Sequence, residues 1–115
     1  MKKFLLLIRE DLNRLSQMSP QELEQDIQTM TQWVEELAKF NTFIAGEPLE
    51  SEARIVSKNH VSSDGPFIEA NEGISGYFII QAETLDQAVE IAAECPHVIE
   101  DKISIEVRPI MEMIE

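Results

Sequence analysis

At 115 residues, with 43% apolar and 27% charged residues, the chain fits one folded domain over residues 1–115 and is too apolar to be disordered. Its net charge of −13 disfavours binding to nucleic acids or anionic membranes, because no Lys/Arg stripe offsets it. The single cysteine, Cys95, excludes an internal disulfide, suits a reducing compartment and is expected to be buried.

The first apolar run, over residues 4–8, predicts a central β-strand that is buried on both faces. It is too short for the ~7–15 apolar residues of a secretory signal, and charged residues follow it at once. No run approaches the ~20 apolar residues of a membrane span. We therefore expect neither a signal peptide nor a membrane anchor. Residues 11–18 predict only a polar connector.

A long amphipathic helix is predicted from Ser19 to about Phe40. Ser19 can cap it, Pro20 suits its first position, and Glu22 completes a capping box. Apolar residues recur at helical spacing along it, namely Leu23, Ile27, Met30, Val34 and Leu37. Gly46 and Pro48 exclude its continuation. Trp33 and the methionines are expected to fill the core or an interface.

The middle of the chain predicts a short hairpin, with strands near residues 53–56 and 60–62 and a turn at Lys58 and Asn59. Asp64-Gly65-Pro66-Phe67 then predicts a tight turn, because Asp bonds its own backbone, Gly tolerates positive φ and Pro fixes φ. Residues 69–75 are polar and glycine-containing, which is typical of a loop or a short helical turn.

The last third predicts strand, helix and strand. Residues 77–80 form the strongest strand signal after the first. Thr84 and Gln87 predict a capped helix ending near Glu94, and residues 103–108 alternate as a final strand. The buried stripe of this helix is expected to contain Leu85, Ala88, Val89 and Ala92.

This order predicts an α+β fold, a ferredoxin-like βαββαβ two-layer sandwich with an extra β-hairpin. Two helices cover only one face of the sheet. The other face would carry Tyr77, Ile79 and Gln81 from one strand and Ser104, Glu106 and Arg108 from the last strand. A second copy of the chain is the simplest cover for such a face, so a homodimer with an enclosed cavity is expected.

Several short motifs in fixed order give the chain a resemblance to the DGPF-containing branch of the YCII-related family. They are Asp64-Gly65-Pro66-Phe67, Glu69, Glu72, Gly76-Tyr77, Leu85-Asp86, Ala92-Ala93-Glu94-Cys95-Pro96, Ile105-Glu106-Val107-Arg108-Pro109-Ile110 and Gly46-Glu47-Pro48-Leu49. The resemblance implies a ferredoxin-like subunit paired into a dimeric α/β barrel, in a bacterial cytoplasmic protein. Relatives of the fold include lyases, isomerases and cofactor-free oxygenases, and related genes often accompany sigma factors.

Two positions depart from the family pattern. Asn71 stands where the family usually has a lysine, and Glu94 stands where it favours an arginine before Cys-Pro. The loss of two cations weakens the hypothesis that the pocket binds an anionic substrate.

Asp64 is the first candidate for acid/base chemistry, although an Asp in this position also serves as a turn residue. Arg108 is the candidate ligand for an anion or carbonyl group, and it could equally pair with Glu106. Tyr77 could donate its hydroxyl to a substrate or pack at the dimer interface. Glu69 and Glu72 could face a substrate or lie on the surface.

The family at large is thought to use a His-Asp pair, and the resemblance makes His60 with Asp64 the only such pair in this chain. His60 and His97 have no neighbours at metal-ligand spacing, so no metal site is predicted. No phosphate-binding loop or dinucleotide fingerprint is present, and no cofactor is predicted.

The leading hypothesis is a dimeric small-molecule-binding protein, with a lyase or isomerase activity that uses Asp64 as acid or base and Arg108 and Tyr77 to orient the substrate. The rival is a non-enzymatic regulatory module that binds a protein partner such as a sigma factor, for which the acidic exterior is suited. A third hypothesis is a dimer whose cavity is filled by side chains such as Tyr77 and Ile79.

Overall fold

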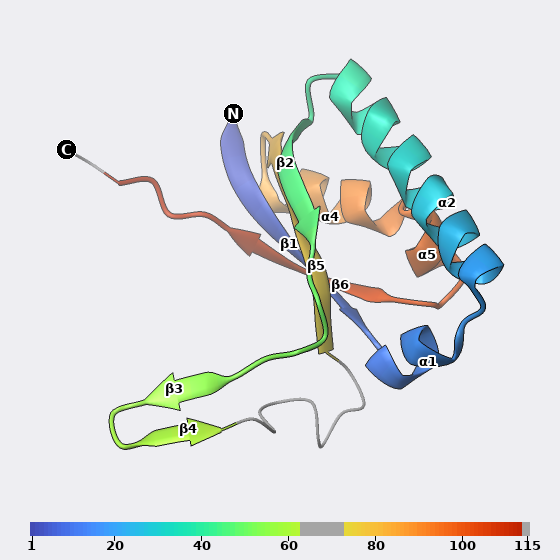
Figure 1. The fold of residues 1–115 in the computed structure, drawn as a ribbon. Coiled ribbons are helices and arrows are strands. Elements are labelled where there is room, and N and C mark those ends of the chain that lie inside the picture. The colour runs from blue at the N-terminus through green and yellow to red at the C-terminus, as the bar shows by residue number, and fades with distance from the viewer. Residues whose placement is uncertain (63–72, 114–115) are drawn as a thin grey trace.

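The computed structural model describes residues 1–62 and 73–113, which form a four-stranded antiparallel sheet, a separate two-stranded hairpin and helices (Figure 1). The order of strands in the main sheet is β2-β5-β1-β6. The strands are β1 (Lys2–Glu10), β2 (Phe43–Pro48), β3 (Ile55–Ser57), β4 (His60–Ser62), β5 (Gly73–Ala82) and β6 (Ser104–Pro109). The helices are α1 (Leu12–Gln17), α2 (Pro20–Lys39), α4 (Leu85–Ala93) and α5 (Pro96–Ile99).

The central strand β1 pairs with β5 on one side and with β6 on the other. Leu6 lies opposite Phe78 and Val107, whereas Leu7 lies opposite Tyr77 and Glu106. Because successive residues of a strand point to opposite sides, these two sets mark two faces of the sheet. We name the face of Leu6 the covered face, since α2 and α4 lie over it (Figure 1). The face of Leu7 is the open face, over which the described residues place no helix.

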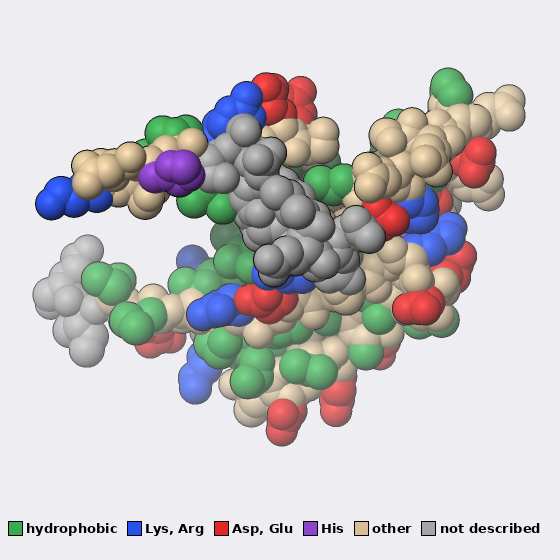
Figure 2. All heavy atoms as spheres, turned by 90° about the horizontal axis from the view of Figure 1, so that it is seen from below, with side chains coloured by type: hydrophobic (Ala, Val, Ile, Leu, Met, Phe, Trp, Pro, Cys, Tyr) green, Lys and Arg blue, Asp and Glu red, His purple; other side chains and the backbone are tan. Residues whose placement is uncertain are grey.

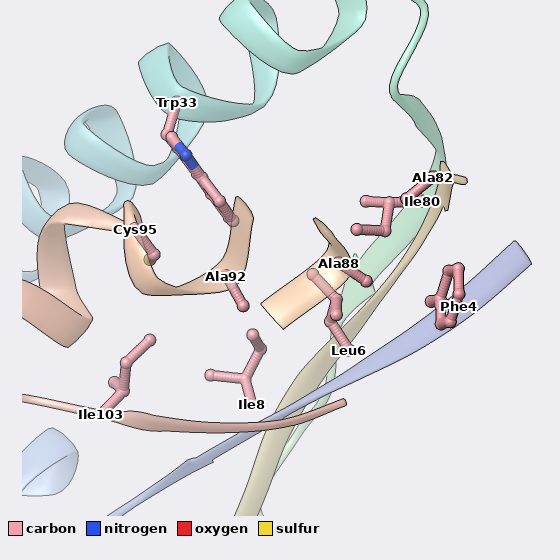
Figure 3. Close-up of a cluster of buried hydrophobic side chains, with 10 residues drawn as sticks. All are labelled: Phe4, Leu6, Ile8, Trp33, Ile80, Ala82, Ala88, Ala92, Cys95 and Ile103. Atoms are coloured by element: carbon pink, nitrogen blue, oxygen red, sulfur yellow. The ribbon is translucent and has the colours of Figure 1, made fainter. Parts of the chain in front are cut away.

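The core lies between the covered face and the two long helices. Figure 3 shows Leu6 and Ile8 of β1 on the side of the sheet where Ala88 and Ala92 of α4 lie. Cys95 is buried, as predicted, and Trp33, expected in the core or an interface, lies in the core. The buried apolar side chains are Phe4, Leu6, Ile8, Trp33, Ile80, Ala82, Ala88, Ala92, Cys95 and Ile103.

Helix starts are set by the predicted capping residues. The Glu22 backbone N–H donates to Ser19 Oγ at 3.1 Å, and the Ser19 N–H donates to Glu22 Oε1 at 3.3 Å, so the first capping box is confirmed. At α4 the Gln87 N–H donates to Thr84 Oγ1 at 3.1 Å. The Gln87 side chain, however, accepts from the Glu83 N–H, so only half of the second predicted box forms.

Strand β2 was not predicted, because Gly46 and Pro48 were interpreted only as residues that stop a helix. Pro48 is tolerated since β2 is an edge strand and Pro48 is its last residue. Gly46 is needed for packing: a Cβ there would overlap the Phe78 ring and lie 2.9 Å from the Tyr77 carbonyl oxygen. The edge position next to β5 therefore belongs to β2, and the predicted hairpin β3–β4 forms a separate sheet.

The structure adds two short helices that the sequence analysis did not predict, and it extends one strand. The polar connector contains the short helix α1, capped by Asp11, and a second short helix, α5, starts at Pro96. Residues 73–75, expected in a loop or a short helical turn, begin β5. Predictions for residues 63–72, including the turn at Asp64-Gly65-Pro66-Phe67, lie outside the described residues.

The predicted buried stripes are partly wrong. On α4, Leu85 and Val89 are exposed, whereas Ile91 packs against the core beside the two small buried alanines. The small alanine side chains allow the helix to lie close to the sheet, so the buried stripe runs through Ala88, Ile91 and Ala92 at i, i+3, i+4 spacing. On α2, Met30, Val34 and Leu37 pack as predicted, but Leu23 and Ile27 are exposed.

Two segments extend away from the helices as arms, the hairpin β3–β4 and the C-terminal segment that follows β6 (Figure 1). Figure 2 shows a recess between them. The radius of gyration is 15.5 Å, above the about 13 Å typical of a compact domain of this length. Apolar side chains are exposed on both arms: Val56 of the hairpin is 74% exposed and Met111 of the tail is 81% exposed.

Candidate functional site

The open face combines an apolar centre with polar groups at its sides. Leu5 lies opposite Ile79 of β5, and Leu7 lies opposite Tyr77. These four side chains are only half-buried in the single chain. The prediction that Tyr77 and Ile79 share a face opposite to Phe78 and Ile80 agrees with this register. The face is thus an apolar strip that the chain does not bury by itself.

An ion cluster lies beside this strip, on β1 and β6. Arg9 donates from Nε and Nη2 to Oε1 of Glu106 at 3.1 and 2.8 Å, and Arg108 donates from Nη1 to Oε2 of the same carboxylate at 3.2 Å. The pairing of Arg108 with Glu106 that the sequence left open therefore forms. These hydrogen bonds, first from Arg9 and then from Arg108, lower the pKa of Glu106. Glu106 is consequently a firmly ionised anchor and a poor proton acceptor.

Arg9 is a residue that the sequence interpretation missed. It was treated only as the charged residue that ends the first apolar run. The signal that could have found it is the period of two through Leu5, Leu7 and Arg9, which places all three on the open face. Arg9 lies opposite Ser104, two pairs along the β1–β6 ladder from Leu7 and Glu106.

Tyr77 takes part in a second polar contact, on the other side of the strip. Its hydroxyl donates to Oε2 of Glu47, which lies opposite it on β2, at 2.9 Å. This hydrogen bond is the main cause of the raised pKa of Tyr77. Tyr77 therefore remains protonated at neutral pH, with its single O–H held by Glu47 and the lone pairs of its oxygen left to accept a hydrogen bond at the edge of the strip.

The proposed acid/base residues are not brought together with this face within the described residues. His60 begins β4 on the hairpin arm, where its side chain is exposed. Asp64, Glu69 and Glu72 lie outside the described residues. The described residues thus unite Arg108, Glu106 and Tyr77 on one face, and place His60 on a separate sheet.

A second charged cluster lies at the junction of β1, α1, α2 and the segment after α5. Arg14 pairs with Glu10 at 3.0 Å and with Asp26 at 3.8 Å, and Lys102 pairs with Asp26 at 3.3 Å. The hydrogen bond to Asp26 is the main cause of the raised pKa of Lys102. These contacts join elements distant in sequence, which gives the cluster a structural role.

His97 and Cys95 also belong to the structural part of the molecule. The buried His97 donates from Nε2 to the Asp26 carbonyl oxygen at 3.1 Å, which joins α5 to α2. Burial raises the pKa of the Cys95 thiol, so the thiol stays protonated in the core. Among residues 1–62 and 73–113, no three His, Cys, Asp or Glu side chains are grouped as metal ligands would be.

A comparison with models of known protein families identifies the family of this chain. Residues 2–114 match the model described as the YCII-related domain. The chain belongs to the YCII-related domain family. No curated protein matches the chain in a sequence search. In the part of this YCII-related domain that the structure describes, no helix is long and apolar enough to span a membrane.

Proposed function

We propose that this YCII-related domain is a small-molecule-binding protein that works as a homodimer. Its subunits would be ferredoxin-like and would pair through their open faces into a dimeric α/β barrel, with the ligand between them. The observation that carries the proposal is the apolar strip of Leu5, Leu7, Tyr77 and Ile79, which a single chain leaves half-buried. Exclusion of this strip from water is the main source of favourable free energy for such pairing.

The two arms support the choice of a second copy as the cover. A two-stranded hairpin has little stability in isolation, and this one exposes Ile55, Val56 and Val61. The C-terminal arm exposes Met111 and Met113. Both arms border the recess seen in Figure 2, so a symmetric partner would receive their apolar side chains as it covers the strip.

The chemistry proposed for the site divides between binding and proton transfer. Arg108 supplies N–H donors for a substrate, Tyr77 offers the lone pairs of its hydroxyl oxygen as an acceptor, and Glu106 fixes the arginines. Glu106 itself is unsuited to proton transfer because each of its oxygens accepts from a guanidinium. An acid/base step of the lyase or isomerase type would fall to Asp64, with His60 as its partner and Glu72 as a further substrate contact.

The test of the proposal is the oligomeric state of two matched variants. Leu7→Lys places a charge in the apolar strip, whereas Val89→Lys places the same charge on the exposed side of α4. Light scattering after size exclusion should show a dimer for the wild type and Val89→Lys, and a folded monomer for Leu7→Lys. A monomeric wild type, or a Leu7→Lys variant that remains dimeric, would show that the open face is not the interface.

A regulatory interaction module is the second candidate, and one observation favours it. Ile27 of α2 is 56% exposed, and Leu23 lies one turn before it on the same apolar stripe. The experiment is a pull-down from native lysate with the wild type and with a Leu23→Ser, Ile27→Ser variant. The candidate requires one stoichiometric partner that the variant loses while its dimer remains intact. An empty pull-down contradicts it.

A further inference from the structure

The described strands bring cations together on the open face of an acidic protein. The strand residues of this face include the cations Lys3, Arg9 and Arg108 and the carboxylates Glu47 and Glu106. Among the strand residues that the structure describes, three of the nine cations and two of the 22 acidic residues lie on this face, a local balance of +1 in a protein of net charge −13. An anion therefore meets cations on these strands, in a protein whose net charge otherwise repels it.

The ion cluster leaves hydrogen-bond donors for a ligand. Glu106 accepts from Nη1 of Arg108, whereas Nε and Nη2 of Arg108 have no acceptor among residues 1–62 and 73–113. The Arg108 side chain is 66% exposed. A guanidinium fork of two parallel N–H groups matches the two oxygens of a carboxylate. Glu106 holds the guanidinium through Nη1. The Arg108 side chain therefore loses less conformational entropy when a ligand binds to its other nitrogens.

The surroundings of Arg108 select among anions. Leu5 lies directly opposite Arg108 across the β1–β6 pair, and Ile79 lies opposite Leu5 across the β1–β5 pair. A ligand that places its carboxylate on Arg108 therefore has an apolar surface beside it. A small hydrophilic anion would leave that surface without a partner, whereas a carboxylate with an apolar body would cover it.

We infer that the ligand of the open face is a monocarboxylate with an apolar body, bound through its carboxylate by Arg108 and through its body by Leu5, Leu7 and Ile79. Arg9 is a positioning residue in this site. It binds one oxygen of Glu106 and so leaves the other oxygen to hold Arg108. The inference rests on the proposed function, because a second copy completes the enclosure of the apolar body.

The test compares acids with their neutral amides of nearly equal shape. Isothermal titration with benzoate and benzamide, and with 4-methylpentanoate and its amide, separates recognition of charge from recognition of shape. Each acid should bind about tenfold more tightly than its amide, which is the usual contribution of a charge-assisted hydrogen bond. The affinity of the acids should also fall as salt is added. Equal affinities within both pairs, or binding of neither acid, would overturn the inference.

Matched variants locate the effect. Arg108→Gln should lower the affinity for benzoate about tenfold and leave the affinity for benzamide unchanged. Lys39→Gln removes the same charge from the exposed end of α2 and should change neither. Arg9→Gln should lower benzoate affinity by a smaller factor, because Glu106 then binds Arg108 with both oxygens. Restoration of the wild-type acid-to-amide ratio by Arg9→Lys would support a positioning role, whereas an unchanged ratio in Arg9→Gln would exclude it.

The oligomeric state shows whether the proposed dimeric function or only the inference about the ligand fails. If the wild type is a dimer through Leu7 and yet binds acids and amides equally, the proposed function stands and the inference about the ligand fails. If the wild type is monomeric and binds neither, the proposed function fails first. If Arg108→Gln weakens the dimer without changing the affinity for benzoate, Arg108 serves the interface and the inference is wrong.

Discussion

Leu6 and Leu7 are neighbours in β1, and they show how differently the two faces of one sheet are used. Leu6 is fully buried between Phe78 and Val107 and belongs to the core under the helices. Leu7 lies between Tyr77 and Glu106 on the open face and is only half-buried. One face of the sheet thus supplies the stability of the single chain, while the other retains apolar side chains for a contact beyond it.

The largest expected effect is the difference in the free energy of unfolding between alanine variants of these two leucines. Leu6→Ala should lower the free energy of unfolding by about 2–5 kcal/mol, because it leaves a cavity in a closed core. Leu7→Ala should cost far less in a dilute monomeric sample, since its side chain already meets water. Urea unfolding of both variants measures the difference.

The same pair also tests the open face. In a concentrated sample, Leu7→Ala should weaken the proposed dimer, whereas Leu6→Ala should act on the fold alone. If both variants lowered the free energy of unfolding equally at low protein concentration, Leu6 and Leu7 would be equally buried in the single chain, and the proposed difference between the two faces would be wrong.

The next effect concerns how tightly β2 approaches β5. Gly46→Ala should destabilise the fold by about 1–3 kcal/mol, because its methyl group would overlap Phe78 on the covered side and approach the Tyr77 carbonyl oxygen. Gly76→Ala is the matched control, since its nearest contact would be the Glu47 carbonyl oxygen at 3.1 Å. Thermal unfolding should place Gly46→Ala below Gly76→Ala in Tm. The reverse order would show that β2 is held loosely.

The ion cluster on the open face gives a smaller effect that depends on pH. The pKa of Glu106 is lowered in the fold, so the folded state binds this proton less tightly than the unfolded chain does. Its contribution to stability is therefore present above the ordinary carboxyl pKa of 4.5 and is lost as the pH falls through the lower folded value. The difference in urea midpoint between wild type and Glu106→Gln should accordingly shrink on acidification.

Glu24→Gln is the control for this pH series, because Glu24 is an exposed acidic residue on α2. A difference between wild type and Glu106→Gln that stays constant into the acid range would show that the arginines do not hold the Glu106 carboxylate in solution. High salt should reduce the Glu106 effect, since the cluster is partly exposed.

The sequence predicted the covered face better than the edges of the sheet. The apolar run of β1, the capping box at Ser19 and the alternation of β6 are strong local signals, and each element formed. Strand β2 was missed because its glycine and proline oppose strand formation locally, and its place is fixed instead by pairing with β5. Leu85 and Val89 were assigned to the core because helical period alone does not determine how α4 rotates on the sheet.

The candidate site could be predicted only in part. Tyr77, Glu106 and Arg108 were placed on one face by alternation alone, and the register of β1 with β5 and β6 brings them around the same strip. Arg9 and Glu47 were missed, because their partners are chosen by strand pairing that a single sequence does not reveal. A carboxylate next to two arginines is a property of the sheet, and no segment of the chain contains it alone.

The smallest effect is on the titration of Tyr77, the only tyrosine of the protein. Its pKa is raised above 10.0, chiefly by the hydrogen bond to Glu47, so the folded state favours the protonated phenol. This contribution to stability is present below pH 10.0 and is lost as the pH rises through the higher folded value. Ultraviolet absorbance should show ionisation at lower pH in Glu47→Gln than in the wild type.

Glu83→Gln, an exposed change outside the sheet, should leave the Tyr77 titration where it is in the wild type. A Glu47→Gln variant that titrates like the wild type would remove Glu47 as the cause. The same spectrum can report on the open face itself: if a second copy covers Tyr77, desolvation raises its pKa further, and dilution of the protein should move the titration toward lower pH. A titration that is independent of concentration would mean that Tyr77 stays in contact with water, and the two faces of the sheet would then differ only in the helices that cover one of them.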